Sequence, residues 1–253
     1  MSSVYSSMNF VLIRRQFDFR GIEMGRWVTP QERDKAAVNF HRALEDLMDV
    51  LHGPEHLISL RGTLGLQYGK GGRPGVAAHY VPATRQLSLA KNAGAGSLAH
   101  EWFHAFDHYM GEKMFQHTLP SQFASERWLN NSTNRLSKND RPHPLNGLLA
   151  DCFKAIMLNE LGDEPSELFQ ASRLADQKLK ILYYAKPEEM SARAFEAFVE
   201  DTKPTSTFLV KGSRYSEEAK IGLYPQGEQR HRINQAFYHY FSLLGRALSQ
   251  DRA

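Results

Sequence analysis

Residues 97–109 read Ser-Leu-Ala-His-Glu-Trp-Phe-His-Ala-Phe-Asp-His-Tyr. Apolar side chains recur on most sides of this segment, which is typical of a buried helix. His100 and His104 are four residues apart, so they share one helix face and can reach a single metal ion. Glu101 stands beside them, where it can hold a water molecule. This His-Glu-x-x-His pattern predicts the zinc-binding helix of a metallopeptidase, with Glu101 as the general base.

Two further polar residues continue this helix. Asp107 lies three residues after His104, on the same face, where it could accept the ring N–H of a zinc-bound histidine. The alternative is that Asp107 is a surface residue near the helix end. His108 is two helical turns, or about 12 Å, from His100, which is too far for both to bind one ion on a straight helix. We therefore expect His108 to be a cation at the helix end or a pocket residue that steadies an oxyanion.

A catalytic zinc usually has three protein ligands and one open position. A third histidine six residues after His104 is excluded because Met110 occupies that position. The best source is a predicted helix over residues 187–201, which carries a polar stripe at helical spacing: Glu189, Arg193, Glu196 and Glu200. We expect Glu189 to turn inward to the zinc. The stripe is also consistent with a solvated face, and three other glutamates are alternative ligands: Glu188, Glu196 and Glu160.

Four stretches of the chain carry a resemblance to a known family: residues 60–66, 75–80, 94–102 and 188–200. Together they resemble the bacterial and phage proteins of the CLCA_X family. The same block looks like the domain called large polyvalent protein-associated domain 1. The resemblance extends from about Phe17 to the end of the chain, and it is most specific in these four stretches.

The pattern is also similar to zinc peptidases whose third ligand is a glutamate on a later helix. This similarity implies three metal ligands: His100, His104 and Glu189. It also implies that an upstream tyrosine, Tyr183 or Tyr184, donates a hydrogen bond to the oxyanion. The lethal-factor-like peptidases carry a second acidic residue four positions after the glutamate ligand. Here that position is Arg193, so the groups behind the ligands differ from that pattern.

The composition sets the broad class of the protein. The 253 residues are 42% hydrophobic, which is enough for one large domain or two small lobes. The net charge of +3 is too small to indicate a nucleic-acid partner. Apolar runs stay well short of the ~20 residues of a membrane span. The single cysteine, Cys152, excludes an intrachain disulfide, so we expect a cytoplasmic protein.

The pattern along the chain predicts an α+β, zincin-like fold. Residues 1–25 look loosely ordered or edge-like, and residues 26–253 are predicted to form one domain. Its N-terminal lobe, 26–115, carries a small mixed sheet and the active-site helix, with Ser97 as N-cap and Gly111 at the C-terminal end. Its mainly helical lobe, 116–253, carries the third ligand. We expect strands at 64–68, 76–81 and 87–90, and helices at 29–51, 146–161, 166–184, 187–201 and 228–248.

Three functions are consistent with these features. The leading hypothesis is a zinc-dependent metallopeptidase that acts on a peptide or protein substrate. The second is a metal-stabilised binding module without activity, associated with phage or mobile-element biology. The third is a nucleic-acid partner protein with a basic face, which the mild net charge disfavours.

Overall fold

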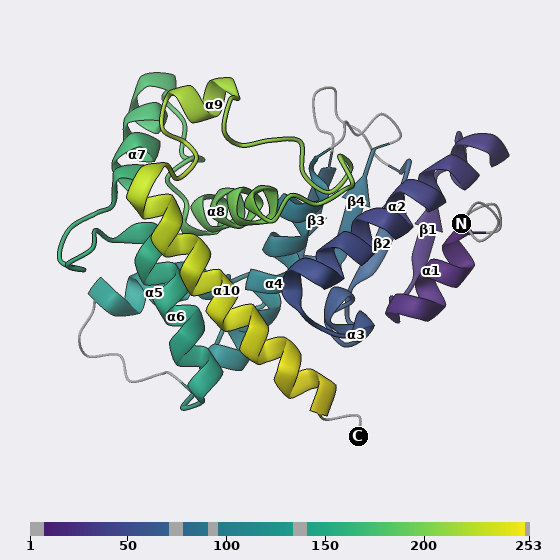
Figure 1. Ribbon diagram of the computed structural model, residues 1–253, viewed down its shortest axis with the longest axis horizontal. Helices are drawn as coiled ribbons and strands as arrows, with labels where there is room; N and C mark the ends of the chain where they lie inside the picture. The colour runs from purple at the N-terminus through teal and green to yellow at the C-terminus, as the bar shows by residue number, and fades with distance from the viewer. Residues whose placement is uncertain (1–7, 71–77, 91–95, 134–140, 251–253) are drawn as a thin grey trace.

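The computed structural model describes residues 8–70, 78–90, 96–133 and 141–250, and it has a mixed α+β fold (Figure 1). A four-stranded sheet has the strand order β1-β2-β4-β3. Strands β1 (Ile22–Met24), β2 (Gly65–Tyr68) and β4 (Gln86–Leu89) run parallel to one another. Strand β3 (Ala78–Val81) pairs antiparallel with β4 and forms one edge. The expected fold class, α+β with a small mixed sheet and a mainly helical C-terminal region, is confirmed.

The two faces of the sheet differ in polarity because successive side chains alternate along a strand. One face carries the buried apolar residues Leu66, Tyr68, Leu87 and Leu89. Helix α2 (Pro30–Leu51) covers it through Phe40, whose ring meets that of Tyr68. Helix α4 (Leu98–Met114) packs against β3 and β4 (Figure 1). The other face carries a hydrogen-bonded polar row: Glu23, Gln67, Gln86 and Ser88.

The C-terminal half consists mainly of helices. They are α5 (Ala124–Thr133), α6 (Pro144–Met157), α7 (Glu167–Leu179), α8 (Pro187–Asp201), α9 (Glu217–Lys220) and α10 (Gly227–Gln250). Helix α10 packs along α6 and α8, and α4 packs along α5 and α8 (Figure 1). Helix α4 is therefore enclosed between the sheet and the helical half.

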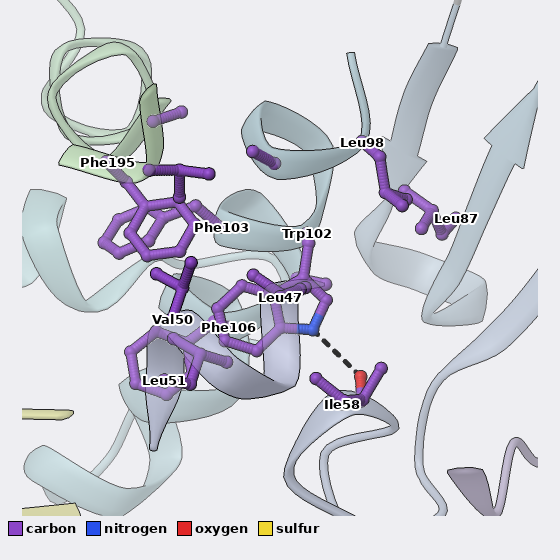
Figure 2. Packing of buried hydrophobic residues seen from close by; sticks show 14 of the residues in the cluster. Leu47, Val50, Leu51, Ile58, Leu87, Leu98, Trp102, Phe103, Phe106 and Phe195 are labelled. Atoms are coloured by element: carbon purple, nitrogen blue, oxygen red, sulfur yellow. Dashed lines mark hydrogen bonds between the residues drawn. The ribbon is translucent and has the colours of Figure 1, made fainter. Parts of the chain in front are cut away.

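An aromatic core fixes α4 against α8. The rings of Trp102, Phe103 and Phe106 on α4 are all fully buried, as is Phe195 on α8 (Figure 2). The Phe103 and Phe195 rings stack with centroids 4.8 Å apart. The Trp102 indole donates a 2.9 Å hydrogen bond to the carbonyl of Ile58, so its one polar atom is satisfied. Since interiors are packed at crystal-like density, this core fixes the relative position of the polar residues on the two helices.

The ends of α4 differ from the expected ones. Ser97 is the N-cap residue, but its side chain makes no capping hydrogen bond. The main-chain N–H of Ala99 donates to the carbonyl of Leu209 instead, so a distant segment satisfies the helix start. Gly111 lies inside the helix and does not end it. A Cβ atom at Gly111 would lie 2.8 Å from the carbonyl oxygen of Gln122, so glycine here permits close packing of the chain that follows the helix.

The N-terminal segment is more ordered than we expected over its described residues. Helix α1 (Phe10–Phe17) begins at Asn9, whose side chain accepts hydrogen bonds from two main-chain N–H groups. It buries Phe10 and Phe17 in the same hydrophobic core as α4. Strand β1 is an edge strand of the sheet. Residues 1–7 lie outside the described residues.

The other predicted elements agree with the structure to different degrees. Helix α8 has the predicted bounds, and α2 begins with a capping box between Thr29 and Glu32. Strands β2, β3 and β4 lie where we expected them, although residues 76 and 77 fall outside the described part. Helix α7 ends at Leu179, five residues before the predicted end at Tyr184. Helices α3 (Glu55–Ile58) and α5 were not predicted, and neither were α1 and α9. Within the described residues, no helix has the length and apolar character needed to cross a membrane.

Candidate metal centre

Helices α4 and α8 bring three potential metal ligands together: His100, His104 and Glu189. The two Nε2 atoms of the histidines are 3.1 Å apart. Glu189 Oε2 lies 3.4 Å from His100 Nε2, and Glu189 Oε1 lies 3.6 Å from His104 Nε2. Ligands on a tetrahedral zinc with bonds of about 2.0 Å are roughly 3.3 Å apart. The three side chains therefore have the spacing of a three-ligand zinc site.

The electrostatics of the site also suit a cation. Glu189 Oε2 is buried and has no hydrogen-bond partner among the described residues, which is costly for a carboxylate oxygen. Burial alone would raise the pKa of Glu189, but the two histidines lower it below its usual range, so it stays ionised. Two imidazole nitrogens and one carboxylate oxygen are the donor set of catalytic zinc sites, which leave a fourth position open. The residues present therefore fit zinc.

Behind this set of ligands, Glu196 orients His100. The His100 Nδ1 lies 3.3 Å from Glu196 Oε2, and the Tyr224 hydroxyl donates a 2.9 Å hydrogen bond to the same oxygen. A carboxylate at Nδ1 holds the proton there and turns Nε2 toward a metal. Glu196 was one of our alternatives for the third ligand, and the structure places it behind a ligand instead. Burial and the Glu196 carboxylate raise the pKa of Tyr224, which stays a neutral hydrogen-bond donor.

Glu101 points from α4 toward strand β3. Its Oε2 accepts a 2.8 Å hydrogen bond from the main-chain N–H of Tyr80. Because this N–H is engaged with α4, it faces away from β4, toward the open edge of the sheet. The bond fixes one oxygen of Glu101 and leaves the other for a water molecule. Glu101 is thus held at the same edge of the cleft as His100.

His108 does not face the cleft as we expected. It is buried, its Nε2–H donates to the carbonyl of Pro120 at 2.7 Å, and its Nδ1 accepts from the Tyr80 hydroxyl at 2.7 Å. Burial lowers the pKa of His108, so the ring is neutral. With both nitrogens bonded, His108 supports strand β3 and is not available to an oxyanion.

Asp107 also has a different partner from the one we expected. Its carboxylate accepts a 2.8 Å hydrogen bond from the main-chain N–H of Ser125 and a 2.5 Å bond from the Ser125 hydroxyl. It therefore holds the first turn of α5. The Nδ1 of His104 has no hydrogen-bond partner among the described residues, so Asp107 does not orient that ring. Complete burial raises the pKa of Asp107 to about 7.

The two candidate tyrosines lie on a turn that folds back from α7. The carboxylate of Asp176 accepts main-chain hydrogen bonds from Tyr183, Tyr184 and Ala185, which fixes this turn. Burial and the neighbouring Glu189 carboxylate both raise the pKa of Tyr183. Tyr184 is tied through its carbonyl to Arg193.

Arg193 is a buried residue that supports this turn. Besides the carbonyl of Tyr184, at 2.5 Å, it donates to the carbonyl of Leu223 at 2.8 Å and to the Ser172 hydroxyl at 3.3 Å. Its guanidinium also lies against the Tyr184 ring. Arg193 thus joins α8 to the chain on both sides of it. The lethal-factor-like peptidases have an acidic residue at the position of Arg193. Here, among the described residues, the acidic partner of the ligand His100 is Glu196, three positions after Arg193.

A cleft of about 960 Å³ opens beside the ligands. Its walls include the proposed base, both candidate tyrosines and the residues behind the ligand: Glu101, Tyr183, Tyr184, Glu196 and Tyr224. Ala78 of β3 and Lys211 also line it. The other two glutamates considered as ligands lie elsewhere: Glu188 is half-buried beside the site, and Glu160 is exposed beyond the end of α6.

Tyr80 and Tyr224 are the two contributors that sequence reasoning missed. Tyr224 comes from an irregular segment with no helical or strand periodicity to mark it. Tyr80 acts through its main chain, which no side-chain motif reports. One signal in the sequence could have indicated Tyr80: it lies on the predicted strand that precedes the His-Glu-x-x-His helix.

Residues 175–248 match the family described as Large polyvalent protein-associated domain 1. This segment is narrower than the resemblance we expected from the sequence, and it contains α8 with Glu189 and Glu196 but not α4. No curated protein and no solved structure matches the chain.

Proposed function

We propose that this protein is a zinc-dependent metallopeptidase. The observation that carries the proposal is the convergence of His100, His104 and Glu189, whose ligand atoms all lie within 4.8 Å of one another. A three-ligand site with an adjacent carboxylate and an open cleft is the arrangement that metal-assisted hydrolysis requires.

Each residue has a role in this proposal. His100, His104 and Glu189 would hold the zinc, which when bound would supply a water molecule with a pKa of about 7 and a Lewis acid for a carbonyl oxygen. Glu101, positioned by the Tyr80 N–H, accepts the proton of the attacking water and passes it to the leaving amine. Tyr183, kept protonated by its raised pKa, donates a hydrogen bond to the oxyanion. Glu196 holds His100 in the tautomer that presents Nε2.

Strand β3 supplies a place for an extended peptide. It is an edge strand, so one row of its main-chain groups is unpaired within the sheet. Ala78 of this strand lines the cleft beside Glu101. A substrate that adds as a further strand would form main-chain hydrogen bonds next to the ligands. We therefore propose an extended peptide or a flexible protein segment as the substrate.

The proposal is tested with a pair of adjacent substitutions. Purified without added metal, the wild type should contain about one zinc per chain by mass spectrometry. Glu189→Ala should lose it, and Glu188→Ala, the control, should keep it. Zinc that is retained equally in both variants would refute Glu189 as a ligand.

Activity requires a separate variant. Glu101→Gln should keep its zinc and hydrolyse unfolded casein at least about 100-fold more slowly, which is the contribution expected of a general base. The control is Glu218→Gln, because Glu218 is an exposed glutamate of the same cleft. Full activity in Glu101→Gln would exclude the proposed mechanism.

A second candidate is a metal-stabilised binding module that does not cut its ligand. It is favoured by the bond from Tyr80 to Glu101, which occupies one oxygen of the base. In that case neither the wild type nor any variant hydrolyses casein. The wild type still contains the metal, and Glu189→Ala lowers the melting temperature. The family match to a domain associated with large polyvalent proteins is consistent with either candidate.

A further inference from the structure

A second pocket lies at the opposite end of α4 from the metal ligands. Its volume is about 520 Å³, which is within the ~300–1,000 Å³ range of small-molecule sites. It is lined by the C-terminal half of α4, the last turns of α10, α3 with the turn after it, and residues 141–146. It shares no lining residue with the metal cleft.

The walls of this pocket are apolar and fixed. Leu57, Leu60, Phe106 and Met110 line it and are each at most 8% exposed, so they belong to the packed core. Leu244 on α10 is half-buried and continues the wall outward. An apolar surface of this kind gains about 25 cal/mol for each Å² that a ligand removes from water.

The mouth of the pocket carries two cations and a histidine. Lys113, Arg141 and His143 line it and are exposed, and none of the described lining residues is acidic. The Arg141 Nε donates to the carbonyl of Phe115 at 3.1 Å, which anchors the guanidinium beside the opening. The His143 Nδ1 accepts from the main-chain N–H of Leu145, so its Nε2 carries the proton and is a donor. Lys113, Arg141 and His143 therefore supply three potential donors to the lining of an apolar pocket.

The backbone at this mouth is strained. Leu60 and Arg61 are consecutive residues with φ of 54° and 58°, in the left-handed region. This conformation costs roughly 1–2 kcal/mol per residue for side chains other than glycine. It places Leu60 in the apolar wall and Arg61 at the lining of the same pocket. Such strain in non-glycine residues clusters at ligand sites.

We propose that this pocket binds a small apolar carboxylate, of the class of a medium-chain fatty acid. The alkyl chain lies against the leucine and phenylalanine walls, and the carboxylate accepts hydrogen bonds from Lys113, Arg141 and His143. Charge complementarity selects this occupant, because an apolar pocket with two cations at its mouth and no acidic group among its described lining residues favours a ligand with one apolar end and one anionic end.

The experiment uses dodecanoate as the probe, below its micelle-forming concentration, with isothermal titration calorimetry. We expect saturable binding of one molecule per chain, at least tenfold tighter than that of dodecan-1-ol. Dodecanoate binding is measured on both the wild type and Glu189→Ala. The two affinities should agree, because the substitution does not change the pocket, and this separates the site from the metal proposal. Equal affinity for the acid and the alcohol would overturn the anion site.

Two variants test the location. Lys113→Glu combined with Arg141→Glu reverses the charge of the mouth and should weaken dodecanoate binding at least tenfold. Lys178→Glu, a matched change at an exposed lysine of α7, should leave it unchanged. Leu244→Trp fills the pocket and should abolish binding without loss of helical circular dichroism. Unchanged binding in the charge-reversed or the filled variant would overturn the proposal, as would binding to anionic vesicles without binding of monomeric dodecanoate.

Discussion

Glu196→Gln is expected to weaken zinc binding although it removes no ligand. In the structure Glu196 is only 7% exposed, and one of its oxygens faces both His100 Nδ1, at 3.3 Å, and the Tyr224 hydroxyl, at 2.9 Å. Glutamine keeps the size and can still accept from Tyr224, so the variant removes the charge that favours a proton on Nδ1. Loss of such a carboxylate costs about 10–100-fold in metal affinity. This corresponds to about 1.4–2.7 kcal/mol.

The assay is competition for zinc with a chromophoric chelator at constant pH. Tyr224→Phe removes one hydrogen bond to Glu196 and should weaken zinc binding less than Glu196→Gln does. Because Tyr224 acts through Glu196, its effect should shrink in the double variant, and this non-additivity marks an indirect role. Glu218→Gln, in the same cleft, is the matched control. If Glu196→Gln binds zinc as tightly as this control, the carboxylate does not orient His100 and the reasoning fails.

Three further predictions concern stability. Phe103→Ala should cost about 3–5 kcal/mol in the free energy of unfolding by urea, because the ring is fully buried against Phe195, whereas an unchanged midpoint would contradict the packing described here. Gly111→Ala should destabilise the protein despite the higher helix propensity of alanine, since the new Cβ would lie 2.8 Å from the Gln122 oxygen; a raised melting temperature would show that this contact relaxes freely. Asp107 has a folded-state pKa of about 7, above its unfolded value near 3.9, so between these pH values the folded protein binds a proton that the unfolded chain does not. The free energy of unfolding should therefore fall as pH rises from about 4 to 7, by at most about 1.4 kcal/mol per pH unit. Asp107→Asn should flatten this part of the pH profile, measured by urea unfolding at pH 5 and pH 7, and an unchanged slope would assign the pH dependence to other groups.

The elements that sequence analysis located best are those whose signals are local. Helix α8 begins at Pro187, a residue suited to a first helical turn, and α2 begins with the Thr29 and Glu32 capping box. The face shared by His100 and His104 follows from helical geometry alone. The inward position of Glu189 was an expectation from the polar stripe on its helix, which a solvated face would also produce.

The features that were missed depend on contacts between distant segments. Asp107 has helical spacing to His104, but Ser125 of an unpredicted helix competes for its carboxylate. Gly111 looked like a helix end because its close approach to another segment is not visible in the sequence. Glu196 lies two turns after Glu189 on the same helix. Only the position of α4 decides which of these two glutamates lies toward a metal and which one supports a ligand.

The separation of the two halves of the metal site along the chain has a consequence for synthesis. His100 and Glu196 are 96 residues apart, so at about 5–20 residues per second α8 emerges from the ribosome roughly 5–20 s after α4. During that interval the nascent chain exposes an aromatic helix face with two histidines and no carboxylate to complete the site. We expect this intermediate to depend on chaperones and to bind zinc weakly, so that metal loading follows the completion of the chain.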